Sequence, residues 1–169
     1  IQSLVKLSRM ESGIIAVHSE DTTITQMLES IQQQFNVKVR EKNITLSLCD
    51  TDLHVRCDSK WTVEALGNIV DNAIKYTACG GNVQIKVEQY SFFVKIDIID
   101  DGIGIEKEEI PKIFGRFYRS LSVADQPGVG IGLFLAREII QAQKGYIKVT
   151  SEREKGSTFS VFLPISKKE

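Results

Sequence analysis

One stretch of the chain, residues 58–77, carries polar side chains at a spacing that suits both a helix and a binding site. At about 100° per residue, its polar members fall within about 80° of one another; they are Glu64, Asn68, Asn72 and Lys75. A solvated helix face is the simpler explanation, but Glu, Lys or Ala would serve such a face better than asparagine. Amide oxygens can bind a hard cation such as Mg²⁺, and a lysine can bind phosphate. The helix alone is only suggestive of such a site.

A second candidate is the carboxylate of Asp100, at the end of an apolar run. Side chains alternate along a strand, so Asp100 falls on the apolar face of residues 94–98 and Asp101 on the other face. A carboxylate on an apolar face is costly without a partner, and an exocyclic amine such as that of adenine would supply one. That contact is worth about 1.5–3 kcal/mol. A turn with a capping aspartate is the alternative for this DxGxG pattern taken alone.

Glycines at the start of a predicted helix form a third candidate, GVGIGL at residues 128–133. Backbone N–H groups at a helix N-terminus can bind phosphate, although a flexible hinge would use the same residues. The run lacks the Gly-Lys-Ser/Thr ending of a P-loop and the GxGxxG of a dinucleotide-binding fold. The turn GSTF at residues 156–159 is a weaker signal, and by itself it indicates only a hairpin.

The elements that must position these residues mix helix and strand patterns without a strict βαβ order. Apolar residues at helical spacing predict helices at 4–13, 24–35, 58–77, 107–113 and 131–143, the second capped by Asp21, Thr22 and Thr23. Strands are predicted at 14–17, 44–48, 53–56, 83–87, 92–99, 146–150 and 158–163. We therefore predict an α+β fold, a two-layer sandwich in which helices cover one face of a mixed sheet.

Length and charge limit the class of protein. The 169 residues carry 21 Lys+Arg and 22 Asp+Glu, a net charge of −1, so we expect no nucleic-acid partner, which would require a strongly basic chain. No apolar run approaches the roughly 18–20 residues needed to cross a bilayer. Three cysteines without a CxxC pair and two scattered histidines argue against a zinc or disulfide framework and favour a reducing cytosol.

Together and in this order, the motifs resemble the N box and glycine boxes of the catalytic ATP-binding domain of sensor histidine kinases. NIVDNAIKYT at residues 68–77 resembles the N box, and IFGRFYR at residues 113–119 resembles the F box, which marks the kinase branch. The resemblance covers residues 58–164. It implies the Bergerat-type ATP-binding (GHKL) fold shared with gyrase, a class of heat-shock chaperones and mismatch-repair ATPases.

The resemblance also implies ATP and Mg²⁺ as cofactors and a role for each matching residue. Asn72 would hold the metal, and three residues would serve the phosphates: Asn68, Lys75 and Arg119. Tyr76 would lie against the adenosine, and Asp100 would bind the adenine amine. The base pocket would be completed by Gly102, Gly104, Ile105 and, through water, Thr158; Gly128, Gly130, Gly132 and Leu133 would flank a lid over the triphosphate. Phe114 and Phe117 would either anchor this lid or fill the core.

The residue at the position of a general base favours a kinase. Hydrolysing relatives place a glutamate one helical turn before the metal-binding asparagine, where this chain has Asn68, whose amide accepts no proton at neutral pH. His18 lacks the helical setting of a phosphoacceptor. We therefore expect the chain to bind ATP and to transfer its γ-phosphate to a histidine on a separate dimerisation domain. The alternatives are a GHKL ATPase, an anti-sigma-type serine kinase and a non-catalytic partner-binding module.

The organisation of a longer protein follows from the same resemblance. Residues 1–13 resemble the C-terminal remnant of a dimerisation and phosphoacceptor helix, and residues 14–169 resemble the catalytic ATP-binding domain. The chain begins with Ile1, so we expect it to be a fragment, monomeric by itself, of the cytoplasmic part of a membrane-anchored sensor kinase. The expected partners are its own dimerisation and phosphoacceptor domain and, through the full-length protein, a response regulator.

Overall fold

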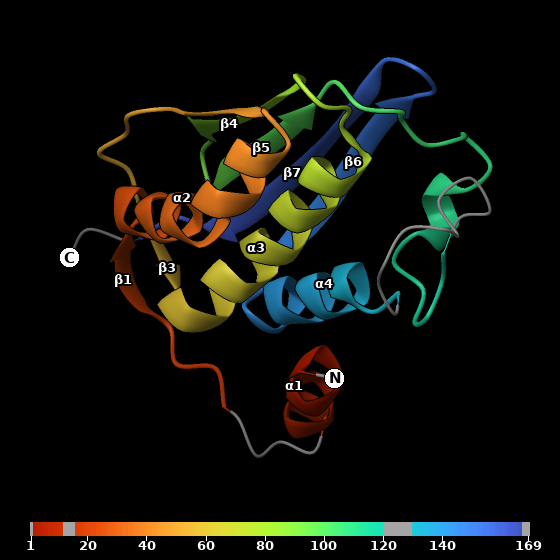
Figure 1. Cartoon of the computed structure of the whole chain (residues 1–169). Helices are drawn as coiled ribbons and strands as arrows, with labels where there is room; N and C mark the ends of the chain where they lie inside the picture. Colours follow the sequence, from red (N-terminus) through yellow and green to blue (C-terminus); the bar gives the residue numbers. More distant parts are fainter. Residues whose placement is uncertain (1, 12–15, 120–129, 167–169) are drawn as a thin grey trace.

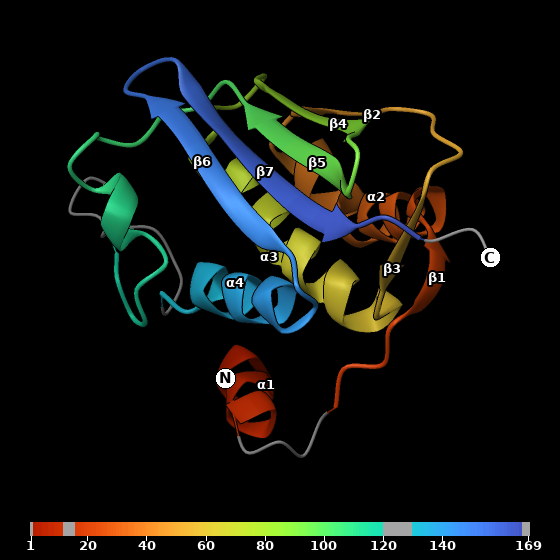
Figure 2. The same ribbon diagram turned by 180° about the vertical axis from the view of Figure 1, so that it is seen from behind.

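The computed structural model of the chain describes residues 2–11, 16–119 and 130–166. Its larger sheet contains β2 (Thr45–Leu48), β4 (Asn82–Gln89), β5 (Phe93–Asp100), β6 (Tyr146–Glu152) and β7 (Gly156–Pro164). The helices α2 (Ile24–Glu41), α3 (Ser59–Tyr76) and α4 (Gly132–Ala142) lie together on one face of this sheet (Figure 1). Seen from behind, the strands lie in front of the helices, and no described element covers their outer face (Figure 2). The predicted two-layer α+β sandwich is confirmed.

The five-stranded sheet has the order β2-β4-β5-β7-β6 and is mixed, as predicted. β2 runs parallel to β4, and the other neighbours are antiparallel. Along β5, every second residue from Val94 to Asp100 is buried, and the residues between them are partly exposed. Because a strand presents alternate side chains to opposite faces, this pattern decides which side chains reach the helix layer, where the site lies.

Helix α3 is fixed at both ends and along its apolar side. Its N-cap is Asp58, whose carboxylate accepts a hydrogen bond from the backbone N–H of Trp61 at 3.1 Å. At the other end, Lys42 Nζ lies 2.8 Å from the carbonyl oxygens of Ile74 and Lys75. The apolar side is completely buried at positions such as Ile69. The polar side chains of α3 are therefore held at defined positions.

The N-terminal part differs from the prediction. Asp21 and Thr22, predicted as capping side chains, lie in β1 (Glu20–Thr23), which pairs antiparallel with β3 (His54–Cys57) in a second, two-stranded sheet. The N-cap of α2 is Thr23, without a capping hydrogen bond from its side chain. Residues 16 and 17 are not in a strand, and residues 14 and 15 lie outside the described residues. The backbone here runs as a connection, and the N–H of His18 donates to Asp58 Oδ2 at 2.9 Å.

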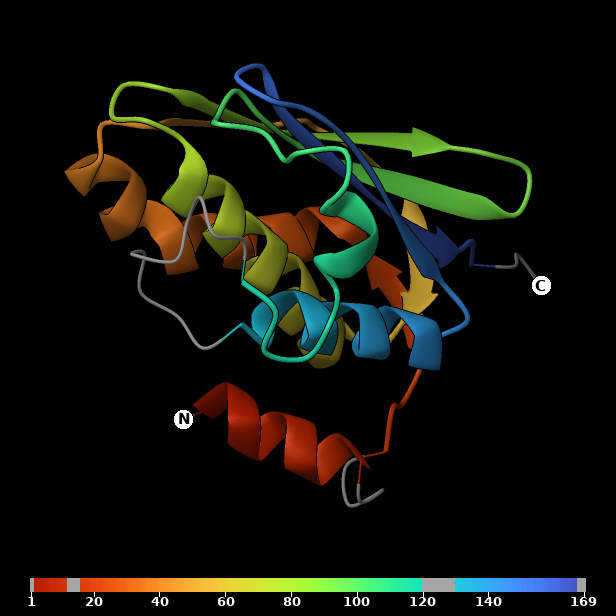
Figure 3. The same ribbon diagram turned by 90° about the vertical axis from the view of Figure 1, so that its right-hand side faces the viewer.

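The first helix, α1 (Gln2–Glu11), lies beside α4 and away from the sheet (Figure 3). Lys6 Nζ lies 2.8 Å from Glu64 Oε2 on α3. Residues 2–11 of the segment assigned to a dimerisation helix thus form a helix of their own, while their membership of such a domain stays a prediction. None of the helices in the described residues is long and apolar enough to cross a membrane.

Candidate active site

A pocket opens between the helix layer and the end of β5. Its walls come from the C-terminal half of α3, the residues after β5, the start of α4 and the beginning of β7. The space within it, open solvent at its mouth included, is about 700 Å³. The predicted residues that line it are Asn72, Tyr76, Asp100, Gly104, Ile105, Arg119 and Leu133. The chain folds so that four separate motifs meet in one cavity.

The carboxylate of Asp100 lies at the sheet side of this pocket and is only 8% exposed. Its Oδ1 accepts a hydrogen bond from the backbone N–H of Gly102 at 2.9 Å, and the backbone N–H of Ser157 also donates to this carboxylate. Burial raises the pKa of Asp100 above its ordinary value, against the lowering effect of these two N–H groups. The carboxylate is thus a buried acceptor beside an open cavity.

Asp101 has the opposite environment, as the alternation along the strand predicts. It is exposed, and its two carboxylate oxygens accept hydrogen bonds from Asn82, one from the backbone N–H at 2.8 Å and one from Nδ2 at 2.9 Å. These hydrogen bonds hold the pKa of Asp101 below its ordinary value. Asp101 therefore caps the neighbouring strand, and Asp100 is the carboxylate that faces the pocket.

The pairing of β5 with β7 decides which side of the sheet Ser157 and Thr158 face. Asp100 stands opposite Ser157, and Ile99 stands opposite Thr158. Residues directly opposite each other share a face of the sheet, so Ser157 is on the helix side with Asp100 and Thr158 is on the outer side. Ser157 is 7% exposed and lines the pocket. The residue beside the buried carboxylate is therefore Ser157, one position before the predicted one.

The two asparagines of α3 have different surroundings. Asn72 lines the pocket. Asn68 is half-buried, and its Nδ2 donates a hydrogen bond to the carbonyl oxygen of Gly132 at 3.1 Å. Because Gly132 is the first residue of α4, this hydrogen bond joins the two helices that form the pocket. The structure thus gives Asn68 a place between the helices rather than in the pocket wall.

Lys75 also lies outside the residues that line the pocket. Its Nζ is 3.2 Å from Oδ2 of Asp71, one turn earlier on α3. Lys38 Nζ, on α2, is 2.9 Å from the other oxygen of the same carboxylate. The lysine predicted to contact phosphate is therefore paired with a carboxylate that it shares with a second lysine.

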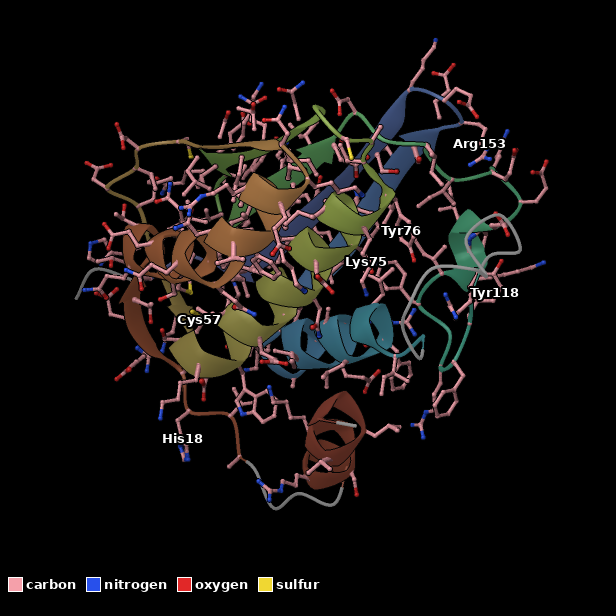
Figure 4. The ribbon with its side chains drawn as sticks, viewed as in Figure 1. His18, Cys57, Lys75, Tyr76, Tyr118 and Arg153 are labelled. Atoms are coloured by element: carbon pink, nitrogen blue, oxygen red, sulfur yellow. The ribbon has the colours of Figure 1, made fainter. Side chains whose placement is uncertain are left out.

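Tyr76 and Arg119 line the pocket from different segments. Tyr76 is the last residue of α3, and burial raises the pKa of its phenol. The positive charge of Arg119 acts on the same phenol in the opposite direction. Figure 4 shows Tyr76 on the helix and Tyr118, the residue before Arg119, on the separate segment that follows β5. A guanidinium held near the pocket supplies positive charge for an anionic ligand.

The loop after β5 is shaped by Gly104, which has a φ of +70°. A Cβ atom at this position would overlap the carbonyl oxygen of Glu152, so only glycine fits both the conformation and the space. The next backbone N–H, of Ile105, donates to Ser151 Oγ at 2.8 Å. These contacts hold the loop against β6 and place Ile105 in the pocket wall.

The glycine-rich run is described only in part. Gly128 lies outside the described residues, while Gly130 directly precedes Ile131, the N-cap of α4, whose first residue is Gly132. Leu133 follows in the first helical turn and lines the pocket. Ile131 is the N-cap and makes no side-chain capping hydrogen bond. The first turn of α4 therefore presents backbone N–H groups next to the pocket, as an anion site requires.

The two phenylalanines of the F-box segment were predicted either to anchor the lid or to fill the core, and their burial differs. Phe114 is 9% exposed, and its ring centroid lies 6.3 Å from that of Phe159 in an edge-to-face arrangement. Phe117 is 56% exposed. Phe114 therefore belongs to the core, and Phe117 does not.

The family model for histidine kinase-, DNA gyrase B-, and HSP90-like ATPases matches residues 57–167. The chain belongs to this family. It is 32% identical over its whole length to the sensor histidine kinase WalK of Bacillus subtilis, of which it covers 28%. It is 30% identical over 97% of its length to the sensor protein kinase PmrB of Pseudomonas aeruginosa, of which it covers 35%. Within the family, the chain is a sensor histidine kinase catalytic domain.

Solved structures place this kinase domain in the same branch. The mycobacterial sensor histidine kinase MprB has a TM-score of 0.77 at 26% identity, over 88% of this chain and 98% of that chain. The catalytic domain of the histidine kinase ThkA has a TM-score of 0.76 at 25% identity, over 88% of this chain and 96% of that chain. Both similarities are to histidine kinase proteins, the branch that the sequence resemblance indicates.

Sequence reasoning missed three polar residues in the pocket of this kinase domain: Glu109, Tyr118 and Ser157. Tyr118 stands between the two F-box residues that were considered, Phe117 and Arg119, so the F box itself was an available signal. Glu109 had none, because its position beside the pocket depends on how residues 103–119 fold. Its carboxylate Oε1 accepts a hydrogen bond from the hydroxyl of Tyr118 at 2.9 Å.

Proposed function

We propose that this kinase domain binds ATP with Mg²⁺ in the pocket and transfers the γ-phosphate to a histidine of a separate dimerisation domain. The observation that carries the proposal is the buried carboxylate of Asp100 in the same cavity as Asn72 and Arg119. ATP has an amine on its base and a strongly anionic tail. A buried acceptor, an amide and a guanidinium in one pocket match these groups.

The residues present fit a magnesium ion that arrives with the nucleotide. Mg²⁺ in nucleotide sites is usually held by one or two protein oxygens together with phosphate oxygens and water. Asn72 offers an amide oxygen in the pocket. In the part of the chain that the structure describes, no three His, Cys, Asp or Glu side chains gather into a metal-binding group. When bound, the ion would neutralise charge on the triphosphate.

The domain's own residues would position ATP rather than activate water. Asn68 cannot serve as a general base, and its amide is already bonded to the carbonyl of Gly132. Arg119 and the first turn of α4 supply positive charge and N–H donors for the transferring phosphate. Because phosphoryl transfer depends mainly on positioning and charge neutralisation, these groups suffice once a histidine nucleophile enters from a partner domain.

The partners and the location of the full-length protein are part of the same proposal. ThkA has been solved in complex with its response regulator TrrA, and full-length ShkA in complex with AMPPNP. By analogy, we expect this domain to bind a nucleoside triphosphate and to act with a response regulator through the longer protein. Its expected location is the cytoplasmic side of a membrane-anchored sensor.

A transfer assay tests the proposal. The chain is mixed with a separately produced phosphoacceptor helix domain and γ-labelled ATP, with Asp100→Asn as the control that should bind nucleotide poorly. We expect label on the acceptor histidine, none on the chain itself and little free phosphate. Nucleotide binding without transfer would contradict the kinase proposal, and rapid phosphate release would indicate a hydrolase. Absence of nucleotide binding would indicate a partner-binding module instead.

A further inference from the structure

The hydrogen bond between Tyr118 and Glu109 closes a loop in the pocket wall. The Tyr118 hydroxyl donates to Glu109 Oε1 at 2.9 Å, across the short 3₁₀ helix η1 (Ile110–Lys112). Both residues are half-buried and line the pocket. A hydrogen bond to a carboxylate is stronger than one between neutral groups. The bond therefore restrains the end of this segment relative to its beginning.

The backbone around Tyr118 is restrained as well. Phe117 has a φ of +62°, a conformation that a bulky residue adopts only when its surroundings impose it. The N–H of Tyr118 donates to the carbonyl oxygen of Gly115 at 3.2 Å. On the other side lies Gly130, with a φ of +76°, where a Cβ atom would come within 2.8 Å of the carbonyl carbon of Phe117. Tyr118 is thus held by its hydroxyl, by its own N–H and by a close backbone neighbour.

The protonation state of Tyr118 suits this hydrogen bond. Burial, together with the hydrogen bond and negative charge of Glu109, raises the pKa of the Tyr118 phenol. The phenol therefore keeps its proton and remains a donor at neutral pH. Arg119 is the next residue along the chain, so its backbone position follows from that of Tyr118. The charge of Arg119 also acts on Tyr76 across the pocket.

We infer that Tyr118 and Glu109 are a positioning pair that fixes Arg119 for the transferring phosphate. The inference rests on the proposed function, because it gives Arg119 its role on phosphate. Neither member of the pair needs to touch the nucleotide: the hydroxyl and the carboxylate act on each other. Loss of the hydrogen bond should therefore slow phosphate transfer and spare the binding of ADP, which lacks the γ-phosphate.

The test uses the trans-phosphorylation assay with Tyr118→Phe, Glu109→Ala and Glu109→Gln. We expect the first two variants to slow label transfer on the order of tenfold, equivalent to about 1.4 kcal/mol of transition-state stabilisation. Glu109→Gln should recover most of the rate, because its amide oxygen can still accept the hydrogen bond. ADP affinity measured by calorimetry and the melting temperature should change little in all three variants.

A double-mutant cycle with Arg119→Ala separates positioning from a merely structural role. In the Arg119→Ala background, Tyr118→Phe should cause no further loss of transfer, because the group that it positions is gone. Additive losses, or a loss of ADP affinity as large as the loss of rate, would overturn the inference. If the wild-type chain transfers label and the variants behave additively, only the inference fails. If the wild-type chain binds ATP and transfers nothing, the proposed function fails first and the inference with it.

Discussion

Replacement of Asp100 by Asn tests the centre of the site with the least change of shape. The carboxylate already accepts backbone N–H groups of Gly102 and Ser157 and retains lone pairs toward the pocket. A hydrogen bond from the adenine amine to this charged acceptor is worth about 1.5–3 kcal/mol, so its loss should raise the dissociation constant roughly 10- to 150-fold. The asparagine amide can keep the contact with Gly102, so the fold should survive.

The direction in which Asp100→Asn changes the stability of the fold follows from the pKa of Asp100. Burial raises the pKa of Asp100, so the folded protein holds this proton more tightly than the unfolded chain does. Between the ordinary pKa and the raised one, the folded state binds more protons, and stability rises as pH falls. Above the raised pKa, the buried charge costs stability. At neutral pH, Asp100→Asn should therefore melt at the same temperature as wild type or higher, and this advantage should shrink in acid.

The assay is calorimetric titration with a non-hydrolysable ATP analogue, combined with thermal melts at neutral and acidic pH. Asp101→Asn is the matched control, because Asp101 is exposed and bonded to Asn82 outside the pocket. It should leave nucleotide affinity nearly unchanged. The reasoning is refuted if Asp101→Asn weakens binding more than Asp100→Asn does, or if Asp100→Asn binds the analogue as tightly as wild type.

Three further predictions concern other parts of the pocket. Gly104→Ala should lower the melting temperature markedly, because its Cβ would overlap the carbonyl oxygen of Glu152. Gly80→Ala, at a φ of +84° with open space around it, should lower the melting temperature much less. Equal melting temperatures for the two variants would contradict the steric argument. Asn72→Ala should abolish the gain in analogue affinity on adding Mg²⁺, as shown by titrations with and without EDTA; an unchanged gain would place the metal elsewhere. Ser157→Ala should weaken nucleotide binding and Thr158→Ala should not, in the same calorimetric titration; the reverse order would restore the original prediction.

Most of the fold could be predicted because its elements carry strong local signals. Helix α3 has an N-cap aspartate, a continuous apolar side and a polar side, and the sequence predicts both of its ends to within one residue. The ends of the hairpin strands β4 and β5 and of the strands β6 and β7 are predicted to within two residues. The small sheet of β1 and β3 could not be predicted, since Glu20–Thr23 is short and polar and becomes a strand only by pairing with His54–Cys57.

The site was predictable where a motif places its residues on one regular element. Asn72 follows from the periodicity of α3 and Tyr76 from the resemblance of this helix to the N box, and both line the pocket. The surroundings of the other polar side chains are only partly local. Lys75 pairs with Asp71 one turn earlier, at a spacing that the sequence shows, but the second lysine on this carboxylate, Lys38, comes from α2 and leaves no trace in local spacing.

The distinction between Asp100 and Asp101 and the position of Ser157 instead of Thr158 beside Asp100 both depend on which face of the sheet a residue occupies. Within one strand, successive side chains point to opposite faces of the sheet, whatever the neighbouring strands are. The choice between the adjacent residues Asp100 and Asp101 could therefore be made from the sequence. Between strands, the face that meets a given residue depends on register, and a shift of one residue exchanges the faces. The register of β7 against β5 places Phe93 opposite Pro164 at one end and Asp100 opposite Ser157 at the other. The sequence therefore predicts which part of the partner strand lies beside Asp100, but not which residue of that part faces it. Ser157 and Thr158 differ by this one position.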